Sequence, residues 1–103
     1  MIDAARYQWE EGRRRLAEYG VETARYRHLM VLVDAVVDEL RRRLGGTFTL
    51  AELAAVYERA EDWVRETVAA ATPPKSRADV KDAALVQDAA FALYARGAVD
   101  YAP

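Results

Sequence analysis

Residues 83–95 read AALVQDAAFALYA, and this apolar segment limits how the chain can fold. Apart from a tyrosine hydroxyl, its only polar side chains are Gln87 and Asp88. The stretch does not alternate polar with apolar residues, so it predicts a helix that lacks a polar face. Such a helix must be covered on both sides. Two arrangements achieve this: the helix lies at the centre of a bundle, or its second face is an interface between copies of the chain.

Working outward from this stretch, the sequence predicts a single all-α domain over residues 1–103, with no strand-like segment. The clearest signals are a capping box that begins at Thr49, a double glycine at Gly45 and a double proline at Pro73. Gly20 either ends the first helix or only kinks it, so the bundle has four helices or three. The helices are expected over about residues 3–19, 22–44, 49–71 and 76–96.

Composition narrows the possible functions of the 103-residue chain. Its formal net charge is −2, so no overall field draws it to nucleic acid or to an anionic membrane. It has no cysteine and a single histidine, His28, without metal-ligand spacing around it. No apolar run approaches the ~20 residues of a membrane span. We therefore expect a cytoplasmic, non-catalytic protein with no cofactor, metal or identified small-molecule substrate.

The apolar surface predicts an interaction with another protein, most simply with a second copy. Three helices barely suffice to surround the stretch 83–95, and Val56 and Trp63 lie together beside the main apolar stripe of the third helix. Tryptophan is common in the cores of interfaces. The primary hypothesis is thus a homodimeric interaction module, whose interface residues are expected to be Val56, Trp63, Val86, Ala89 and Leu93.

Two arginine runs, 13–15 and 41–43, suggest an alternative function as a nucleic-acid-associated regulator. However, acidic residues lie four positions before the arginines that would form the basic patch, in the orientation that favours ion pairs within a helix. Solvated helix faces are the simpler interpretation, and nucleic acid is an unlikely partner. The arginines of this candidate patch are Arg14, Arg15, Arg42 and Arg43.

Residues 46–54, GTFTLAELA, are similar to the first helix of helix-turn-helix regulators, in which Thr-x-x-Glu-Leu-Ala is frequent. That motif needs a short turn and then a recognition helix. Here residues 55–71 are expected to continue as one helix, and the missing turn argues against DNA reading.

Acidic side chains give a third hypothesis. Asp88 lies in the most apolar helix, so its charge must be paired or its pKa must rise. An ion pair with Arg25 or Arg65 is the structural interpretation, and a ligand-binding carboxylate in a small-molecule-binding bundle is the functional one. A second acidic group lies on the third helix at spacings of four and predicts a compensating partner. Its members are Glu58, Asp62 and Glu66.

Three segments, 46–53, 62–63 and 88–101, together resemble uncharacterised small helical proteins of high-GC actinobacteria. The resemblance implies a cytoplasmic setting and no particular activity, cofactor or partner.

Overall fold

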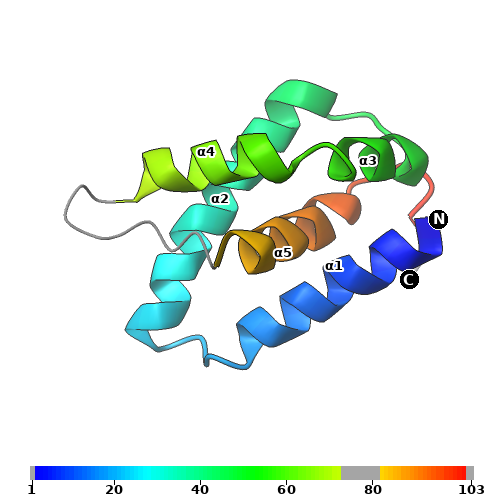
Figure 1. Ribbon diagram of the computed structural model, residues 1–103. Helices are drawn as coiled ribbons and strands as arrows, with labels where there is room; N and C mark the ends of the chain where they lie inside the picture. Colours follow the sequence, from blue (N-terminus) through cyan, green and yellow to red (C-terminus); the bar gives the residue numbers. More distant parts are fainter. Residues whose placement is uncertain (1, 73–81, 102–103) are drawn as a thin grey trace.

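The computed structural model describes residues 2–72 and 82–101, and five α-helices account for most of this part (Figure 1). No strand occurs among these residues, so the all-α prediction is confirmed. None of the helices described is long and apolar enough to cross a membrane. The helices are α1 (Ile2–Ala17), α2 (Ala24–Leu44), α3 (Leu50–Tyr57), α4 (Glu61–Ala71) and α5 (Ala83–Ala95).

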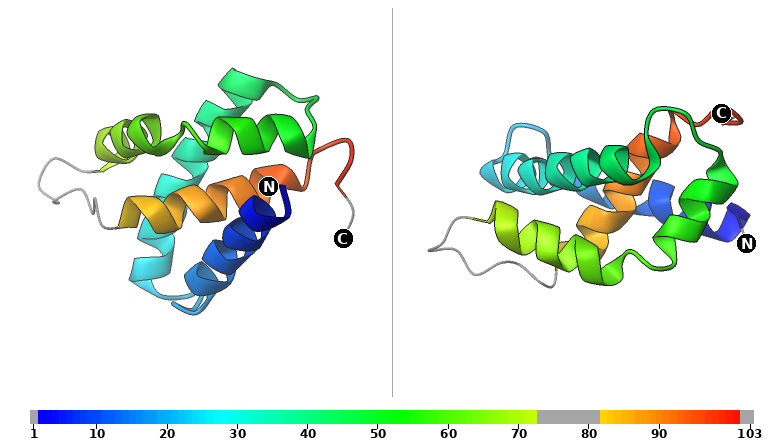
Figure 2. Two further views of the ribbon diagram at one scale, coloured as in Figure 1. Left: turned by 45° about the vertical axis from the view of Figure 1, so that its right-hand side comes forward. Right: turned by 90° about the horizontal axis from the view of Figure 1, so that it is seen from above.

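The expected third helix is two helices, so the predicted number of four is wrong. A turn over residues 58–60 separates α3 from α4, and its amides of Arg59 and Ala60 bond to carbonyls three residues back. This tight turn changes the direction of the chain, as Figure 2 shows. It allows α3 to contact α1 while α4 contacts α2, which one straight helix of ~30 Å would not allow.

The other helix ends follow local signals. Gly20 has a φ of +83°, and α1 ends before it, so it marks a helix end rather than a kink. The hydroxyl of Thr23 accepts a hydrogen bond from the Tyr26 amide and caps α2. The predicted capping box of α3 is present, with Thr49 and Glu52 bonding to each other's amides at 3.2 and 3.0 Å. The predicted start of the last helix, at residues 76–79, lies outside the described residues.

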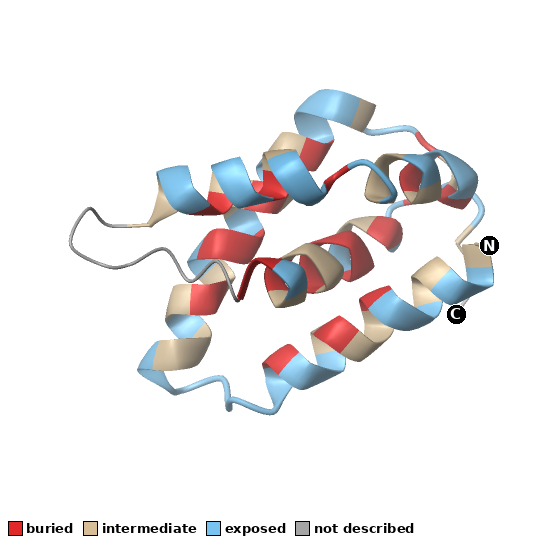
Figure 3. Cartoon of the chain, in the orientation of Figure 1, coloured by how far each residue is buried: buried red, intermediate tan, exposed pale blue. Residues whose placement is uncertain are grey.

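Helix α5 lies at the centre of the molecule and contacts each of the other four helices (Figures 1 and 2). In Figure 3 its ribbon is mainly in the colours of buried and intermediate residues. It lies very close to α1 at Gly12, where an added Cβ would lie 2.3 Å from the Cβ of Asp88. Glycine on α1 and alanines on α5 permit this short distance between the helices.

The central position of α5 shows that the other helices of the same copy cover most of its apolar surface. Val86 and Ala89, which we predicted in an interface, are fully buried in a single copy and belong to its own core. Leu93 is the exception, with 38% of its surface exposed. The surrounding helices cover more of α5 than expected because small side chains let them approach closely, and because α3 and α4 cover it separately. The apolar character of α5 therefore no longer argues for association.

Candidate functional site

A groove on the surface is formed where α2 ends, α3 ends and α4 begins. It has a volume of about 490 Å³. Val56 and Trp63, the other two residues of the predicted interface, form its apolar part and are each partly exposed. The turn over residues 58–60 creates this groove, since it separates the two helices that carry these side chains. We call it the Trp63 groove; it is lined by Arg43, Ala55, Val56, Glu58, Arg59 and Trp63.

Trp63 is held firmly in this groove. Its ring centroid lies 6.3 Å from that of the fully buried Phe91, and the guanidinium carbon of Arg43 lies 4.5 Å from the centroid of the Trp63 ring. Arg43 is itself fixed by an ion pair with Glu39 at 2.9 Å. A large aromatic side chain fixed in a partly exposed position is typical of the anchor residues of protein interfaces.

Several charged side chains in or near the Trp63 groove, unlike Arg43, have no ion pair within the described part of the chain. Arg59 lines the groove and has no ion pair there, and the same holds for the predicted acidic group of Glu58, Asp62 and Glu66. The nearby Arg65 pairs with Glu61 at 2.7 Å instead. The compensating partner that the acidic spacing predicts is thus not supplied by the residues described.

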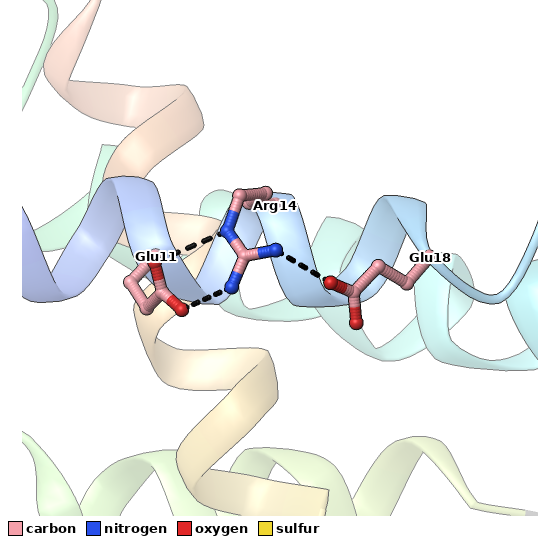
Figure 4. Close-up of polar contacts among 3 residues, drawn as sticks. All are labelled: Glu11, Arg14 and Glu18. Carbon is pink, nitrogen blue, oxygen red and sulfur yellow. Dashed lines mark hydrogen bonds and ion pairs between the residues drawn. The ribbon is translucent and has the colours of Figure 1, made fainter.

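Five of the six arginines in the two runs, in contrast, form ion pairs within their own helices, whereas Arg15 forms none among the described residues because Glu11 pairs with Arg14. Figure 4 shows Arg14 between two carboxylates, with two hydrogen bonds to Glu11 and an ion pair of 2.5 Å to Glu18. The hydrogen bond to Glu11 raises the pKa of Arg14 and lowers that of Glu11. The exact pairing differs from the predicted spacing of four, because several pairs join residues three apart. The other pairs are Arg13–Glu10, Arg41–Asp38, Arg42–Glu39 and Arg43–Glu39.

The two runs also lie far apart in one copy. Residues 13–15 are near the end of α1, which joins the start of α2, whereas residues 41–43 end α2 after 21 residues, or about 30 Å (Figure 1). Their arginines do not form one basic patch.

The helix-turn-helix comparison needs correction in one respect. A short turn does follow the GTFTLAELA segment, so the absence of a turn no longer argues against DNA reading. The charge of the second helix does argue against it. Residues 50–72 contain five carboxylates and two arginines, and Glu61, Asp62 and Glu66 are exposed on α4. A recognition helix with this surface would be repelled by phosphates.

Asp88 forms a second candidate site with Tyr57, which sequence reasoning did not identify as its partner. The Tyr57 hydroxyl donates to a carboxylate oxygen of Asp88 at 2.5 Å and lies 2.9 Å from the side-chain amide of Gln8. These contacts join α1, α3 and α5. The predicted pairing of Asp88 with Arg25 or Arg65 is wrong, because Arg25 pairs with Asp82 and Arg65 with Glu61. The only sequence signal was that a tyrosine on an apolar stripe needs a partner for its hydroxyl.

The protonation of this pair follows from its partial burial. Burial raises the pKa of Asp88, while the hydrogen bond from Tyr57 and the charge of Arg15 act in the opposite direction. The pKa of Tyr57 is also raised, by burial first and then by the hydrogen bond to Asp88 and its charge. A cavity of about 400 Å³ opens beside the pair, but the strongest polar contact of Asp88 is already made within the chain.

No protein-family model, curated protein or solved structure matches this chain. Among residues 2–72 and 82–101, no group of three or more histidine or acidic side chains is arranged to hold a metal ion. The function is therefore inferred from the geometry of two features, the Trp63 groove and the Tyr57–Asp88 pair.

Proposed function

We propose that the chain is a non-catalytic protein–protein interaction module that binds its partner in the Trp63 groove. The observation that carries the proposal is the position of Trp63, which is fixed against the core by Phe91 and Arg43 yet remains partly exposed. Aromatic and arginine side chains in such settings provide most of the binding energy of protein interfaces.

The charged residues around the groove support the same function. Interfaces have an apolar centre and a polar rim. Here Val56 and Trp63 supply the centre, and Glu58 and Arg59 supply rim charges without an ion-pair partner in the described residues. The Tyr57–Asp88 pair differs because its polar groups bond to each other, which favours a structural role for it.

Site-specific photo-cross-linking tests the proposal. A photoreactive benzophenone side chain is placed at Ala55, which is exposed and lines the groove, in cells that express the full chain. The matched control places it at Ala51, which is exposed on the same helix but does not line the groove. We expect a covalent protein adduct of defined mass from Ala55 and little or none from Ala51.

The adduct must also depend on the groove and be reproduced with purified components. Adding Val56→Glu should reduce it strongly, since a carboxylate would then face the apolar centre. Equal yields from Ala51 and Ala55, or no adduct from either position, would refute an interaction through this groove.

A further inference from the structure

We infer that the partner in the Trp63 groove is a second copy of this chain, with the two α4 helices antiparallel across a two-fold axis near Trp63. This inference rests on the proposed function and names its partner. It does not depend on α5, which a single copy already encloses.

The charges on α4 and on the turn before it favour a second copy over a partner of one charge. Arg59 lies four residues before Trp63, and Glu66 lies three residues after it. Both are exposed, and neither has an ion pair in the described part of the chain. A strongly basic partner would be repelled by Arg59 and Arg43. A strongly acidic partner would be repelled by Asp62 and Glu66. A surface with separated charges of both signs complements a reversed copy of itself.

Two-fold symmetry turns this pattern into specific contacts. In a two-fold interface, the same patch of both copies meets in opposite directions. If two α4 helices cross antiparallel near Trp63, Arg59 of one copy lies beside Glu66 of the other, and symmetry repeats this pair. Arg59 and Glu66 are two of the four charges in or near the groove that have no ion pair in the described part of one copy, and in this arrangement they neutralise each other twice.

The shape of the surface also permits this contact. Ala70 lies seven residues after Trp63, on the same face of α4, and is exposed, as is Ala55 on the facing part of α3. Small side chains at these positions let another helix approach, while each Trp63 provides an aromatic anchor near the axis.

A charge exchange measured by sedimentation velocity tests the inference on the full chain at low salt. Arg59→Glu and Glu66→Arg each place like charges together twice, and each should weaken the dimer by about tenfold or more. The double variant Arg59→Glu/Glu66→Arg restores unlike pairs and should return to within about threefold of the wild-type dissociation constant. Both positions are exposed, so circular dichroism should show unchanged helix content in every variant.

Because the sequence has no cysteine, disulfide trapping gives a second measurement. Asp62→Cys removes a carboxylate that the proposed axis would bring close to its own copy, places a thiol there, and should form a covalent dimer rapidly under mild oxidation. Tyr7→Cys, on the 70% exposed Tyr7 of α1, is the control and should not.

The outcomes separate this inference from the proposed function. A wild-type chain that stays monomeric at millimolar concentration, or a double variant as weak as the single ones, overturns the second copy as partner. If the Ala55 probe still joins a different protein through the groove, the interaction module survives that result. If neither dimer nor adduct is found, both proposals fail.

Discussion

The Tyr57–Asp88 pair and the Trp63 groove share the end of α3, which carries both Tyr57 and Val56, yet their polar groups differ in whether they have a partner. Asp88 is half-buried, and Tyr57 supplies its hydrogen bond. Arg59 and Glu66 remain exposed without an ion pair in the described residues. A charged group near the core needs a hydrogen-bond or ion-pair partner within the chain, because burying it without one costs stability. A charged group at the rim of an interface is solvated and can form its ion pair when another molecule binds. The Tyr57–Asp88 pair therefore stabilises the fold, whereas the Trp63 groove is the candidate surface for recognition of a partner.

The largest expected effect on stability comes from a substitution in the core beside the Tyr57–Asp88 pair. Phe91 is fully buried, and its ring packs against Trp9, Tyr57 and Trp63. Phe91→Ala should reduce the free energy of unfolding by about 4 kcal/mol, measured by urea denaturation. Leu93→Ala, on the same helix but 38% exposed, is the control and should cost less than about 1.5 kcal/mol. Equal losses would contradict the enclosed position of α5.

The next effect tests the contact between α1 and α5. A methyl group on Gly12 would lie 2.3 Å from the Cβ of Asp88 and 3.2 Å from the Ala89 amide nitrogen. Gly12→Ala should therefore destabilise the fold by about 2 kcal/mol, even though alanine favours a helix. Gly46→Ala is the matched control, since no atom lies within 4 Å of its added Cβ, and it should be nearly neutral. A stable Gly12→Ala variant would show that the helices are farther apart.

Removing the Tyr57 hydroxyl tests whether the hydrogen bond to Asp88 stabilises the fold. Tyr57→Phe leaves the ring in the core but removes the hydrogen bond to Asp88. We expect a loss of about 1.5 kcal/mol at neutral pH, because the bond is made to a charged group. Tyr7→Phe, where the tyrosine is 70% exposed, should change the free energy of unfolding by no more than about 0.5 kcal/mol. If both variants behave alike, the Tyr57 hydroxyl has no structural role.

A smaller effect concerns pH. Burial raises the pKa of Asp88 in the folded state above its ordinary value of 3.8. The stability that this carboxyl group contributes is therefore fully present below pH 3.8 and is lost as the pH rises through its folded pKa. Asp88→Asn does not titrate, so the stability of the wild type relative to this variant should fall as the pH rises above 3.8 and through the folded pKa of Asp88. A difference that is constant or increases with pH would contradict the raised pKa.

The smallest expected effect lies in the groove itself. Arg43→Met removes the cation above the Trp63 ring and should cost about 0.5 kcal/mol, with a change in tryptophan fluorescence. Arg42→Met, next to it and also paired with Glu39, is the control and should leave the fluorescence unchanged. An unchanged spectrum in both variants would mean that Arg43 does not hold Trp63 in solution.

Several features of this protein were predictable because they depend on residues close together in the chain. The capping box from Thr49 to Glu52 and the ends of α1 and α2 at glycines are of this kind. The turn over residues 58–60 was not predictable. It contains no glycine or proline, and the apolar spacing from Leu50 to Val68 is the same for one helix as for two joined by a tight turn.

The candidate site was predictable only in part. Val56 and Trp63 were identified as neighbours beside an apolar stripe, and the structure places them in one groove. Val86 and Ala89 were assigned to the same kind of surface but lie in the core. Their helix is apolar on every side, so its composition gives no indication of which side is covered by the chain itself.

The helical class, the ends of most helices and the need of residues 83–95 for cover on both sides all follow from the order of the residues. The helices that cover residues 83–95, and the side chains that pair with each charge, became known from the folded structure alone. Tyr57 meets Asp88 across 31 positions and Arg25 meets Asp82 across 57. Caps and helix ends are set by contacts within about one turn, which the order of residues fixes directly. Long-range pairs depend on how the packed helices are oriented, and that orientation results from the whole core at once.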